Sequence, residues 1–235
     1  MFSGTSTKQA INILALHGKG ASGTNFRQTL ASLIDASNNN DHDMTCEWTF
    51  LDAPFDGQWW TLPPNTRSFN AKEYCGFDES ARVVMDELCD GTKQYDVVLG
   101  HSQGAILLSA LMATKTDVIS AAGVNGYVLN GAAWPNPYTA ELEKFVYNGN
   151  EISNSRTTKV LFVIGARDKI NPPDGARRVQ KSLEVGGLAV DTINHEGGHS
   201  FPVDDEKSVG AMIQWILSTV RAKQMDGSVI TSSKI

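Results

Sequence analysis

The chain has 235 residues, of which 41% are hydrophobic and 20% charged, so it can bury a sizeable core and is not expected to be disordered. Its formal net charge of −6 argues against nucleic acid as the main partner, because phosphate binding draws on a surplus of Lys and Arg. The three scattered cysteines, Cys46, Cys75 and Cys89, form neither a disulfide framework nor a metal site with recognisable ligand spacing, and we expect reduced thiols and no metal.

Short apolar runs alternate with amphipathic segments, which is the pattern of βα units around a mainly parallel sheet. In chain order, strands are predicted over Ile11–Leu16, Cys46–Leu51, Asp96–Gly100, Val124–Asn130, Lys159–Gly165 and Leu188–Ile193. Helical spacing is found at Phe26, Leu30, Leu33 and Ile34, from Asp78 to Leu88, and over Ala105–Met112, Ala176–Leu183 and Val209–Val220. We therefore expect one α/β domain over residues 1–235, with helices on both faces of the sheet, a core over about 11–220 and a flexible tail over about 222–235.

The ends of the chain give no signal for export or for a membrane. Residues 1–9 are polar, and no apolar run approaches the ~20 residues that a membrane helix needs, so we expect a cytoplasmic protein. The final Ser233-Lys234-Ile235 differs from the peroxisomal Ser-Lys-Leu signal only in its last aliphatic residue, which leaves a peroxisomal location open.

Two aromatic-rich segments, Ala53–Phe77 and Gly131–Tyr147, interrupt the alternation of strands and helices. Both follow predicted strands, so they should lie over the carboxyl edge of the sheet, where open α/β proteins bind ligands. They predict either the walls of a substrate pocket or surface loops that aromatic anchors hold down. The residues expected to line such a pocket are His17, Phe55, Trp59, Trp60 and Trp134.

The strongest motif is Gly100-His101-Ser102-Gln103-Gly104, which matches the nucleophile elbow G-x-S-x-G. A buried strand precedes it and a buried helix follows it, as that motif requires. The serine should adopt a strained turn with φ above zero, and its flanking residues should be tiny, because a Cβ there would strike a neighbouring element. The motif predicts Ser102 as a nucleophile, while a plain turn with a capping serine is the alternative.

A serine hydroxyl needs a base to attack at neutral pH, and the chain has five histidines. His42 lies in a polar loop, His17 follows the first strand, and His101 is too close to Ser102 in sequence. His199 lies in a glycine-rich loop between the last strand and the last helix, which is where this kind of fold carries its base. We predict His199 as the base, with His195, close to the strand end, as the second choice.

The imidazole in turn needs a carboxylate that fixes its tautomer. Asp168 follows the predicted strand Lys159–Gly165 and lies between Ser102 and His199 in the chain, so the order is serine, aspartate, histidine. An aspartate that only opens a turn is the alternative. Asp52, Asp191 and Asp204 are worse placed.

A tetrahedral intermediate needs two preorganised donors for its oxyanion. The backbone N–H of Gln103, directly after the serine, is the first candidate. The second is the backbone N–H of Lys19, in the turn Leu16-His17-Gly18-Lys19-Gly20 that follows the first strand. The alternative is that this glycine-containing turn has no role beyond reversing the chain.

Taken together, these landmarks resemble the FSH-type family of serine hydrolases, small eukaryotic enzymes with the α/β-hydrolase fold. The resemblance runs from about Ile11 to Val220 and is carried by Leu16-His17-Gly18, Asp52-Ala53-Pro54, Gly100-His101-Ser102-Gln103-Gly104-Ala105, Asn125-Gly126-Tyr127, Gly165-Ala166-Arg167-Asp168 with Pro172, and His195-Glu196-Gly197-Gly198-His199. It implies esterase or thioesterase activity on small-molecule acyl substrates without a cofactor. The positions that match the family's catalytic residues are Ser102, Asp168 and His199.

The chain departs from the family pattern at Lys19, where an apolar residue would be expected. Its ammonium group would favour an anionic or polar acyl group if it faced the site, and would have no such effect if it faced solvent. The leading interpretation is an esterase that works through an acyl-enzyme; a thioesterase with the same triad and a non-catalytic binding module are the alternatives. The sequence does not indicate the natural substrate or the oligomeric state.

Overall fold

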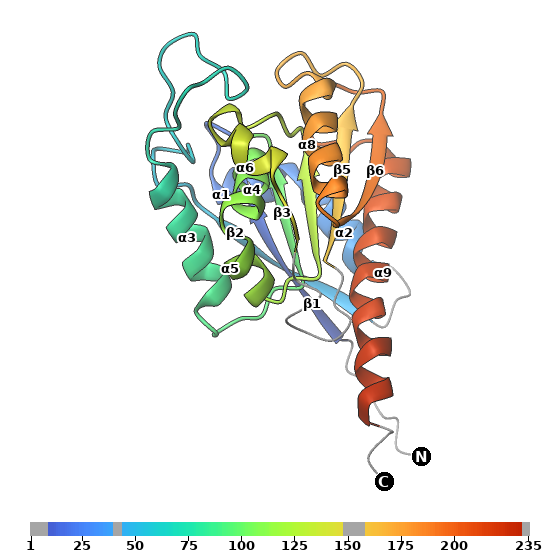
Figure 1. Cartoon of the computed structure of the whole chain (residues 1–235). Coiled ribbons are helices and arrows are strands. Elements are labelled where there is room, and N and C mark those ends of the chain that lie inside the picture. Colours follow the sequence, from blue (N-terminus) through green and yellow to red (C-terminus); the bar gives the residue numbers. More distant parts are fainter. Residues whose placement is uncertain (1–8, 40–43, 148–157, 232–235) are drawn as a thin grey trace, which may run out of the picture.

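The computed structural model describes residues 9–39, 44–147 and 158–231 (Figure 1). Its six strands form one parallel sheet in the order β2-β1-β3-β4-β5-β6. The strands are β1 (Gln9–Leu16), β2 (Met44–Leu51), β3 (Val97–His101), β4 (Gly126–Asn130), β5 (Lys159–Gly165) and β6 (Ala189–His195). Each of the six predicted strands is present, with ends that differ from the prediction by at most two residues.

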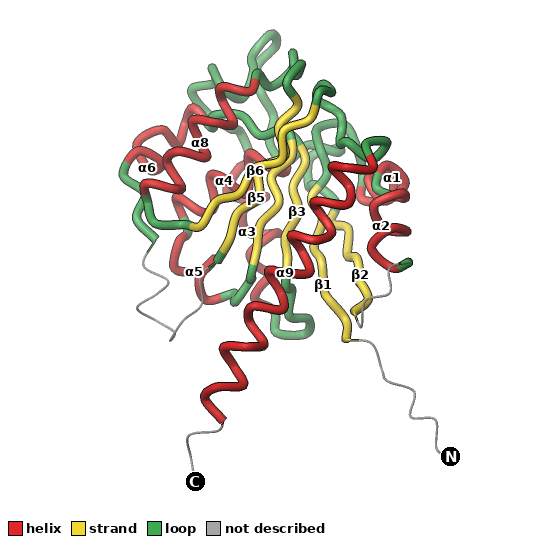
Figure 2. Tube along the Cα trace, turned by 90° about the vertical axis from the view of Figure 1, so that its right-hand side faces the viewer, coloured by secondary structure: helices red, strands yellow, loops and turns green. Residues whose placement is uncertain are grey.

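Helices cover both faces of the sheet (Figures 1 and 2). One face carries α1 (Gly23–Thr29), α2 (Ala31–Asn38) and α9 (Glu206–Thr231). The other carries α3 (Phe77–Cys89), α4 (Gln103–Thr114), α5 (Thr116–Ala121), η1 (Asn136–Tyr138), α6 (Thr139–Glu143) and α8 (Pro173–Val185). The expected α/β architecture, a mainly parallel sheet between two layers of helices, is confirmed.

Burial on both faces explains the composition of the central strands. Val97, Val98 and Leu99 of β3 have no exposed surface, because successive side chains enter opposite cores. Helix α4 follows β3 directly, and its residues from Gln103 to Met112 are all buried. A helix that is apolar all round fits only the interior, and here it lies behind the middle of the sheet.

Parallel strands bring their carboxyl ends to one edge of the sheet. The registers pair Leu16 with Gly100, His101 with Asn130, and Gly165 with His195. The turns that follow these residues therefore lie side by side, although they are far apart in the chain. Every residue predicted to carry chemistry lies on or just after one of these strand ends.

Several helix predictions differ from the structure. The helix expected around Phe26 and Ile34 is two helices, α1 and α2, which meet at Leu30. Helix α9 continues past Val220 to Thr231, where a tail was expected. The short α5, η1 and α6 were not predicted. Ser233-Lys234-Ile235 and His42 lie outside the described residues, and within the described part no helix is long and apolar enough to cross a membrane.

Candidate active site

Ser102 lies on the turn between β3 and α4 in the strained conformation that the motif predicts. Its φ is 52° and its ψ −114°, and non-glycine residues rarely take a positive φ. Its backbone N–H donates to the carbonyl of Asn130 at the end of β4, 2.9 Å away. The turn is thus anchored to the neighbouring strand while the side chain faces the sheet edge.

The glycines of the elbow are required by close packing. A Cβ on Gly104 would lie 2.5 Å from the carbonyl oxygen of Leu16, and one on Gly100 would lie 2.7 Å from the backbone nitrogen of Ala105. Both distances are shorter than any real Cβ contact, and the atoms they meet are backbone atoms that cannot turn aside. The prediction of tiny residues around Ser102 is therefore confirmed at Gly100 and Gly104, two positions before and after it.

The structure brings His199 next to Ser102. His199 Nε2 lies 2.8 Å from Ser102 Oγ across 97 positions of the chain. The loop that carries His199 can approach the sheet because β5 ends in Gly165, where a Cβ would lie 2.1 Å from the carbonyl oxygen of Gly198. The separation of the ring nitrogen from the hydroxyl is within the range for general base catalysis.

Asp168 holds the other ring nitrogen of the same imidazole. Its Oδ2 lies 2.7 Å from His199 Nδ1, while its Oδ1 accepts the backbone N–H groups of Ile170 and Asn171 at 2.8 and 2.9 Å. The carboxylate is buried, with only 3% of its side chain exposed. Three hydrogen bonds therefore fix its orientation, and it in turn selects the His199 tautomer that presents Nε2 to the serine.

His195, the second choice for the base, is directed elsewhere. It is the last residue of β6, it is buried, and its Nδ1 accepts the backbone N–H of Gly197 at 3.2 Å. Burial lowers its pKa below the ordinary value for histidine. This ring supports the start of the loop that carries His199 and does not reach Ser102.

His101, which the sequence analysis set aside, lies against His199. Its ring centroid is 5.2 Å from that of His199 and 5.9 Å from that of Phe26, with which it is stacked. Burial first, and the neighbouring His199 second, lower the pKa of His101 to about 4. Sequence position alone gave no sign of this contact, because it depends on how the loop after β6 folds back.

Gln103 and the turn that contains Lys19 both adjoin Ser102, and their role as oxyanion donors stays a prediction. Gln103 opens α4, so its N–H is one of those that an α-helix leaves without an internal acceptor. The turn after β1 packs directly on the elbow, since a Cβ on Gly18 would lie 3.2 Å from Ser102 Cβ. Lys19 follows Gly18 and is exposed.

The pocket prediction requires correction for most of its residues. His17, Trp59 and Trp60 have no exposed surface, and Trp134 is 4% exposed, so these side chains do not line an open pocket. Hydrogen bonds and ring contacts hold them inside: Trp60 stacks on Tyr74 with centroids 4.3 Å apart. The interpretation of the aromatic segments as loops held down by anchors describes them better.

Phe55 and Trp134 show two further features of these segments. Phe55 is partly exposed, and its ring lies over Gly76, so its place in a pocket stays a prediction. Trp134 is covered by the guanidinium of Arg178, 3.7 Å from its ring centroid, and donates its indole N–H to Thr139. It therefore anchors the second aromatic segment to α8.

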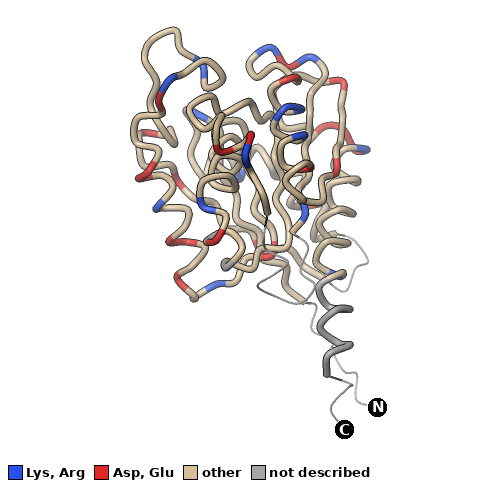
Figure 3. Tube along the Cα trace, in the orientation of Figure 1, with Lys and Arg blue, Asp and Glu red and all other residues tan. Residues whose placement is uncertain are grey.

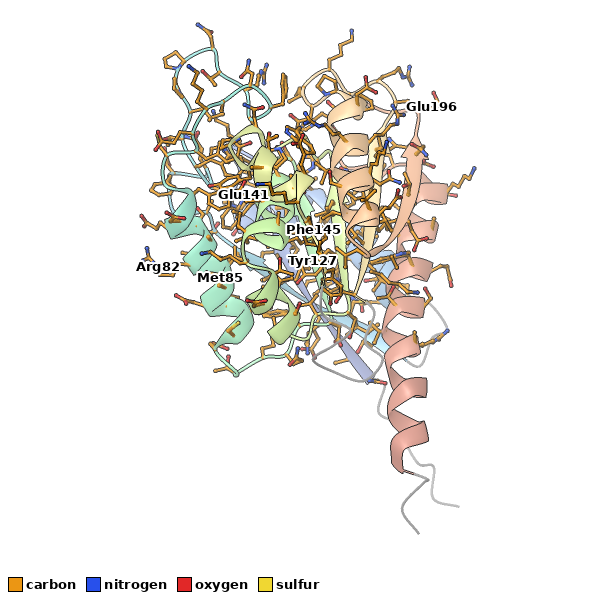
Figure 4. The ribbon with its side chains drawn as sticks, in the orientation of Figure 1. Arg82, Met85, Tyr127, Glu141, Phe145 and Glu196 are labelled. Atoms are coloured by element: carbon orange, nitrogen blue, oxygen red, sulfur yellow. The ribbon has the colours of Figure 1, made fainter. Side chains whose placement is uncertain are left out.

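The rim around the site carries charges of both signs. Arg167 follows β5 and donates to the carbonyl of Glu196, which follows β6 and is labelled at the upper rim in Figure 4. Acidic and basic residues are interspersed along the described chain in the view of Figure 3.

Among the described residues, no group of three His, Cys, Asp or Glu side chains is arranged to hold a metal ion. Cys46, Cys75 and Cys89 are free.

Comparison with proteins of known structure finds chains with a similar fold. SOBER1 of Arabidopsis thaliana is 18% identical and superposes with a TM-score of 0.60 over 90% of this chain and 99% of that one. Acyl-protein thioesterase 2 of Zea mays is 18% identical, with a TM-score of 0.62 over 90% of this chain and 94% of its own. At these identities the likeness concerns the fold, which is the expected α/β-hydrolase fold.

Comparison of sequences is more specific. A Danio rerio protein described as Esterase OVCA2 is 28% identical over 148 residues, which cover 61% of this chain and 60% of that protein, so the match spans less than two thirds of the relative. The family model described as Serine hydrolase (FSH1) matches residues 6–210. Because the matched residues make up most of the length of this chain, it belongs to the FSH1 family of serine hydrolases.

Proposed function

We propose that this protein is a carboxylic-ester hydrolase in which Ser102, His199 and Asp168 act as a catalytic triad. The observation that carries the proposal is the continuous relay from Asp168 Oδ2 through both nitrogens of His199 to Ser102 Oγ, with separations of 2.7 and 2.8 Å. Nucleophile, base and orienting acid are thereby in contact, which is the arrangement that activates a serine hydroxyl.

In the acylation step, Ser102 Oγ attacks the carbonyl carbon of the ester while its proton passes to His199 Nε2. The imidazolium that forms is stabilised by the Asp168 carboxylate. The tetrahedral intermediate collapses when the bond to the leaving alcohol breaks, and His199 gives its proton to that oxygen. The product of this step is an acyl ester of Ser102.

The negative oxygen of the intermediate is held by the backbone N–H groups of Gln103 and Lys19. Support for this comes from the position of Gln103 at the start of α4, whose N-terminal dipole favours negative charge. The close packing of Gly18 against Ser102 supports the neighbouring Lys19 N–H as the second donor. In deacylation, water takes the role of the serine hydroxyl, and the acid is released with the enzyme restored.

The substrates are small-molecule acyl esters, or thioesters that the same relay would cleave. The relative from Danio rerio is described as an esterase, whereas the Zea mays protein with a similar fold is described as an acyl-protein thioesterase. Both reactions pass through the same acyl-enzyme. Comparing kcat/KM on an oxygen ester and a thioester with the same acyl chain decides between them.

The test uses p-nitrophenyl esters of short and medium chain length with the wild-type protein and Ser102→Ala. We expect the variant to lose at least about a thousandfold in kcat/KM. Ser218→Ala, which removes an exposed hydroxyl on α9, is the matched control and should retain activity. Labelling by a fluorophosphonate probe of the wild type but not of Ser102→Ala would exclude a non-catalytic binding module, and hydrolysis by Ser102→Ala at the wild-type rate would overturn the proposal.

A further inference from the structure

The turn that carries the second oxyanion donor is held by one neighbouring segment, residues 52–60, which follows β2. Asp52 Oδ1 accepts the backbone N–H of Gly23 at 2.6 Å, and the carbonyl of Gly57 accepts the N–H of Gly20 at 2.7 Å. These contacts tie the segment to the far end of the turn. The turn itself is exposed at Lys19, while its Gly18 is buried.

His17 connects the near end of the turn to the same segment. Its Nε2 accepts the backbone N–H of Ala53 at 3.1 Å, so the ring proton is on Nδ1. That Nδ1 lies 2.8 Å from the carbonyl oxygen of Gly18 and donates to it. The buried imidazole thus bridges residue 53 to the peptide bond between Gly18 and Lys19.

This hydrogen bond determines the direction of the proposed oxyanion donor. In a trans peptide, the C=O and the following N–H point in opposite directions. The Gly18 carbonyl is held by the His17 ring and, at 3.3 Å, by the N–H of Ala21. Because the carbonyl is fixed on that side, the N–H of Lys19 is turned to the other.

Trp59 fixes the backbone on which this arrangement is built. Its indole N–H donates to the carbonyl of His17 at 2.8 Å, and its ring lies 5.4 Å from the His17 ring, centroid to centroid. Trp59 has no exposed surface, so no water competes for this bond. Its own carbonyl accepts the hydroxyl of Ser80 on α3.

The side chain of Gln103 ties the same segment to the first oxyanion donor. Gln103 Oε1 accepts the backbone N–H of Trp59 at 2.9 Å, and its Nε2 donates to the carbonyl of Trp60 at 2.8 Å. The same segment therefore contacts Gln103 and residues on both sides of Lys19, namely His17 and Gly20.

We infer that Trp59 is a positioning residue for the oxyanion hole, which sets the Lys19 N–H relative to the Gln103 N–H through its bonds to His17 and Gln103. The inference rests on the proposed esterase function. It assigns the buried tryptophan a role in stabilising the transition state, without contact with the substrate.

The test is Trp59→Phe, which keeps an aromatic ring and removes the indole N–H. Removal of an oxyanion donor lowers kcat by about a hundredfold or more. Displacing a donor costs less than deleting one, so we expect the kcat of Trp59→Phe to fall by about tenfold. KM should change less than twofold. Affinity for a trifluoromethyl ketone, which forms a tetrahedral adduct with the serine, should fall in parallel with kcat/KM.

Trp215→Phe is the matched control, since it also removes one indole hydrogen bond of 2.8 Å, to Asp191, and lies on α9 away from the site. We expect it to keep the wild-type kcat and inhibitor affinity. Activities are compared at a temperature well below the Tm of each variant, so that a difference in folding does not enter. A Trp59→Phe protein with wild-type kcat and inhibitor affinity would overturn the inference.

Failure of the proposed function gives a different result. If the wild-type protein hydrolyses no ester, the rates at which a fluorophosphonate labels wild type, Trp59→Phe and Trp215→Phe are compared instead, because phosphonylation also places a negative oxygen in the hole. Slower labelling of Trp59→Phe alone supports the positioning role, and equal labelling contradicts it. If the wild type hydrolyses esters and Trp59→Phe is equally active, the esterase proposal stands and the positioning role of Trp59 is contradicted.

Discussion

Four histidines lie at the carboxyl edge of the sheet, and besides His17 these are His101, His195 and His199, whose surroundings differ. His199 is held between a carboxylate and a hydroxyl, which suits proton transfer. His195 is buried and His101 is partly buried, and burial lowers the pKa of both. A neutral His101 beside His199 adds no positive charge to the site at neutral pH.

The lowered pKa of His101 predicts that stability falls in mild acid. The unfolded chain takes up a proton near pH 6.5, whereas the folded protein takes it up only near pH 4. Between these values the unfolded state binds more protons, so the free energy of unfolding decreases as the pH falls. We expect His101 to contribute about 1–2 kcal/mol of this loss between pH 7 and pH 5, measured by urea unfolding.

His101→Phe provides the comparison, because a phenyl ring occupies the same aromatic cluster and does not titrate. The variant should lose less stability than the wild type over the same pH interval. Identical losses in the two proteins would show that other groups, such as His195, account for the dependence.

At this scale, the sequence predicted the residues whose place follows from a local motif. The strained Ser102 and its small neighbours follow from the strand, turn and helix that surround them. The role of His17 and Trp59 did not follow, because a tryptophan in an aromatic loop has the same pattern whether it faces a substrate or a backbone carbonyl. Only the hydrogen bonds at 2.8 Å to residues 17 and 18 distinguish the two.

Among the elements, the amino ends of three strands are joined by one aspartate. Asp96, just before β3, accepts the backbone N–H of Asn12 in β1 at 3.0 Å and the side-chain amide of Asn125, before β4, at 3.1 Å. Its backbone groups also bond to residues 12, 125 and 126. This cluster lies at the edge of the sheet opposite to Ser102.

Asp96→Ala should therefore destabilise the protein without changing its chemistry. Loss of a charged acceptor from partly buried donors costs about 1.5–3 kcal/mol, which should lower the Tm by several degrees. The kcat of the folded fraction should stay at the wild-type value. Asp86→Ala, an exposed carboxylate on α3, should leave the Tm unchanged, and a similar loss in both variants would contradict the assignment.

The elements that sequence patterns predicted are those with a continuous apolar run or a clear period. The central strands were predicted from runs such as Val97–Leu99, which are apolar throughout. The pair α1 and α2 was expected as one helix, because Leu30 continues the apolar spacing while the chain bends there. Helices α5, η1 and α6 have at most six residues, too few to show a period.

At the scale of the whole molecule, the last helix, α9, belongs to the helical layer on one face of the sheet. Helix α9 buries Met212, Ile213, Ile216, Leu217 and Val220 against the sheet face that it shares with α1 and α2. The predicted core over about residues 11–220 ends at the last of these. The boundary of the folding unit is therefore predicted to lie just after Val220.

A chain shortened to end at residue 222 should keep its Tm within about 2 °C of the full chain and keep its activity. A chain that ends at Gly210 should not fold, because burial of each lost apolar side chain contributes about 1.5–3 kcal/mol and the sum exceeds the stability of an ordinary domain. Thermal unfolding followed by circular dichroism checks both. A large fall in Tm on removal of residues 223–235 would place the boundary further along α9.

The order in which the sheet receives its reactive groups has a consequence for biosynthesis. Ser102 is translated 97 positions ahead of His199, and the loop that delivers the imidazole follows the last strand. On the proposed mechanism, a nascent chain that contains Ser102 but not yet His199 still carries an ordinary, unreactive serine hydroxyl. Translation products that end before His199 therefore lack the base and should not hydrolyse esters. The serine becomes reactive only after the final quarter of the protein has been made and has folded.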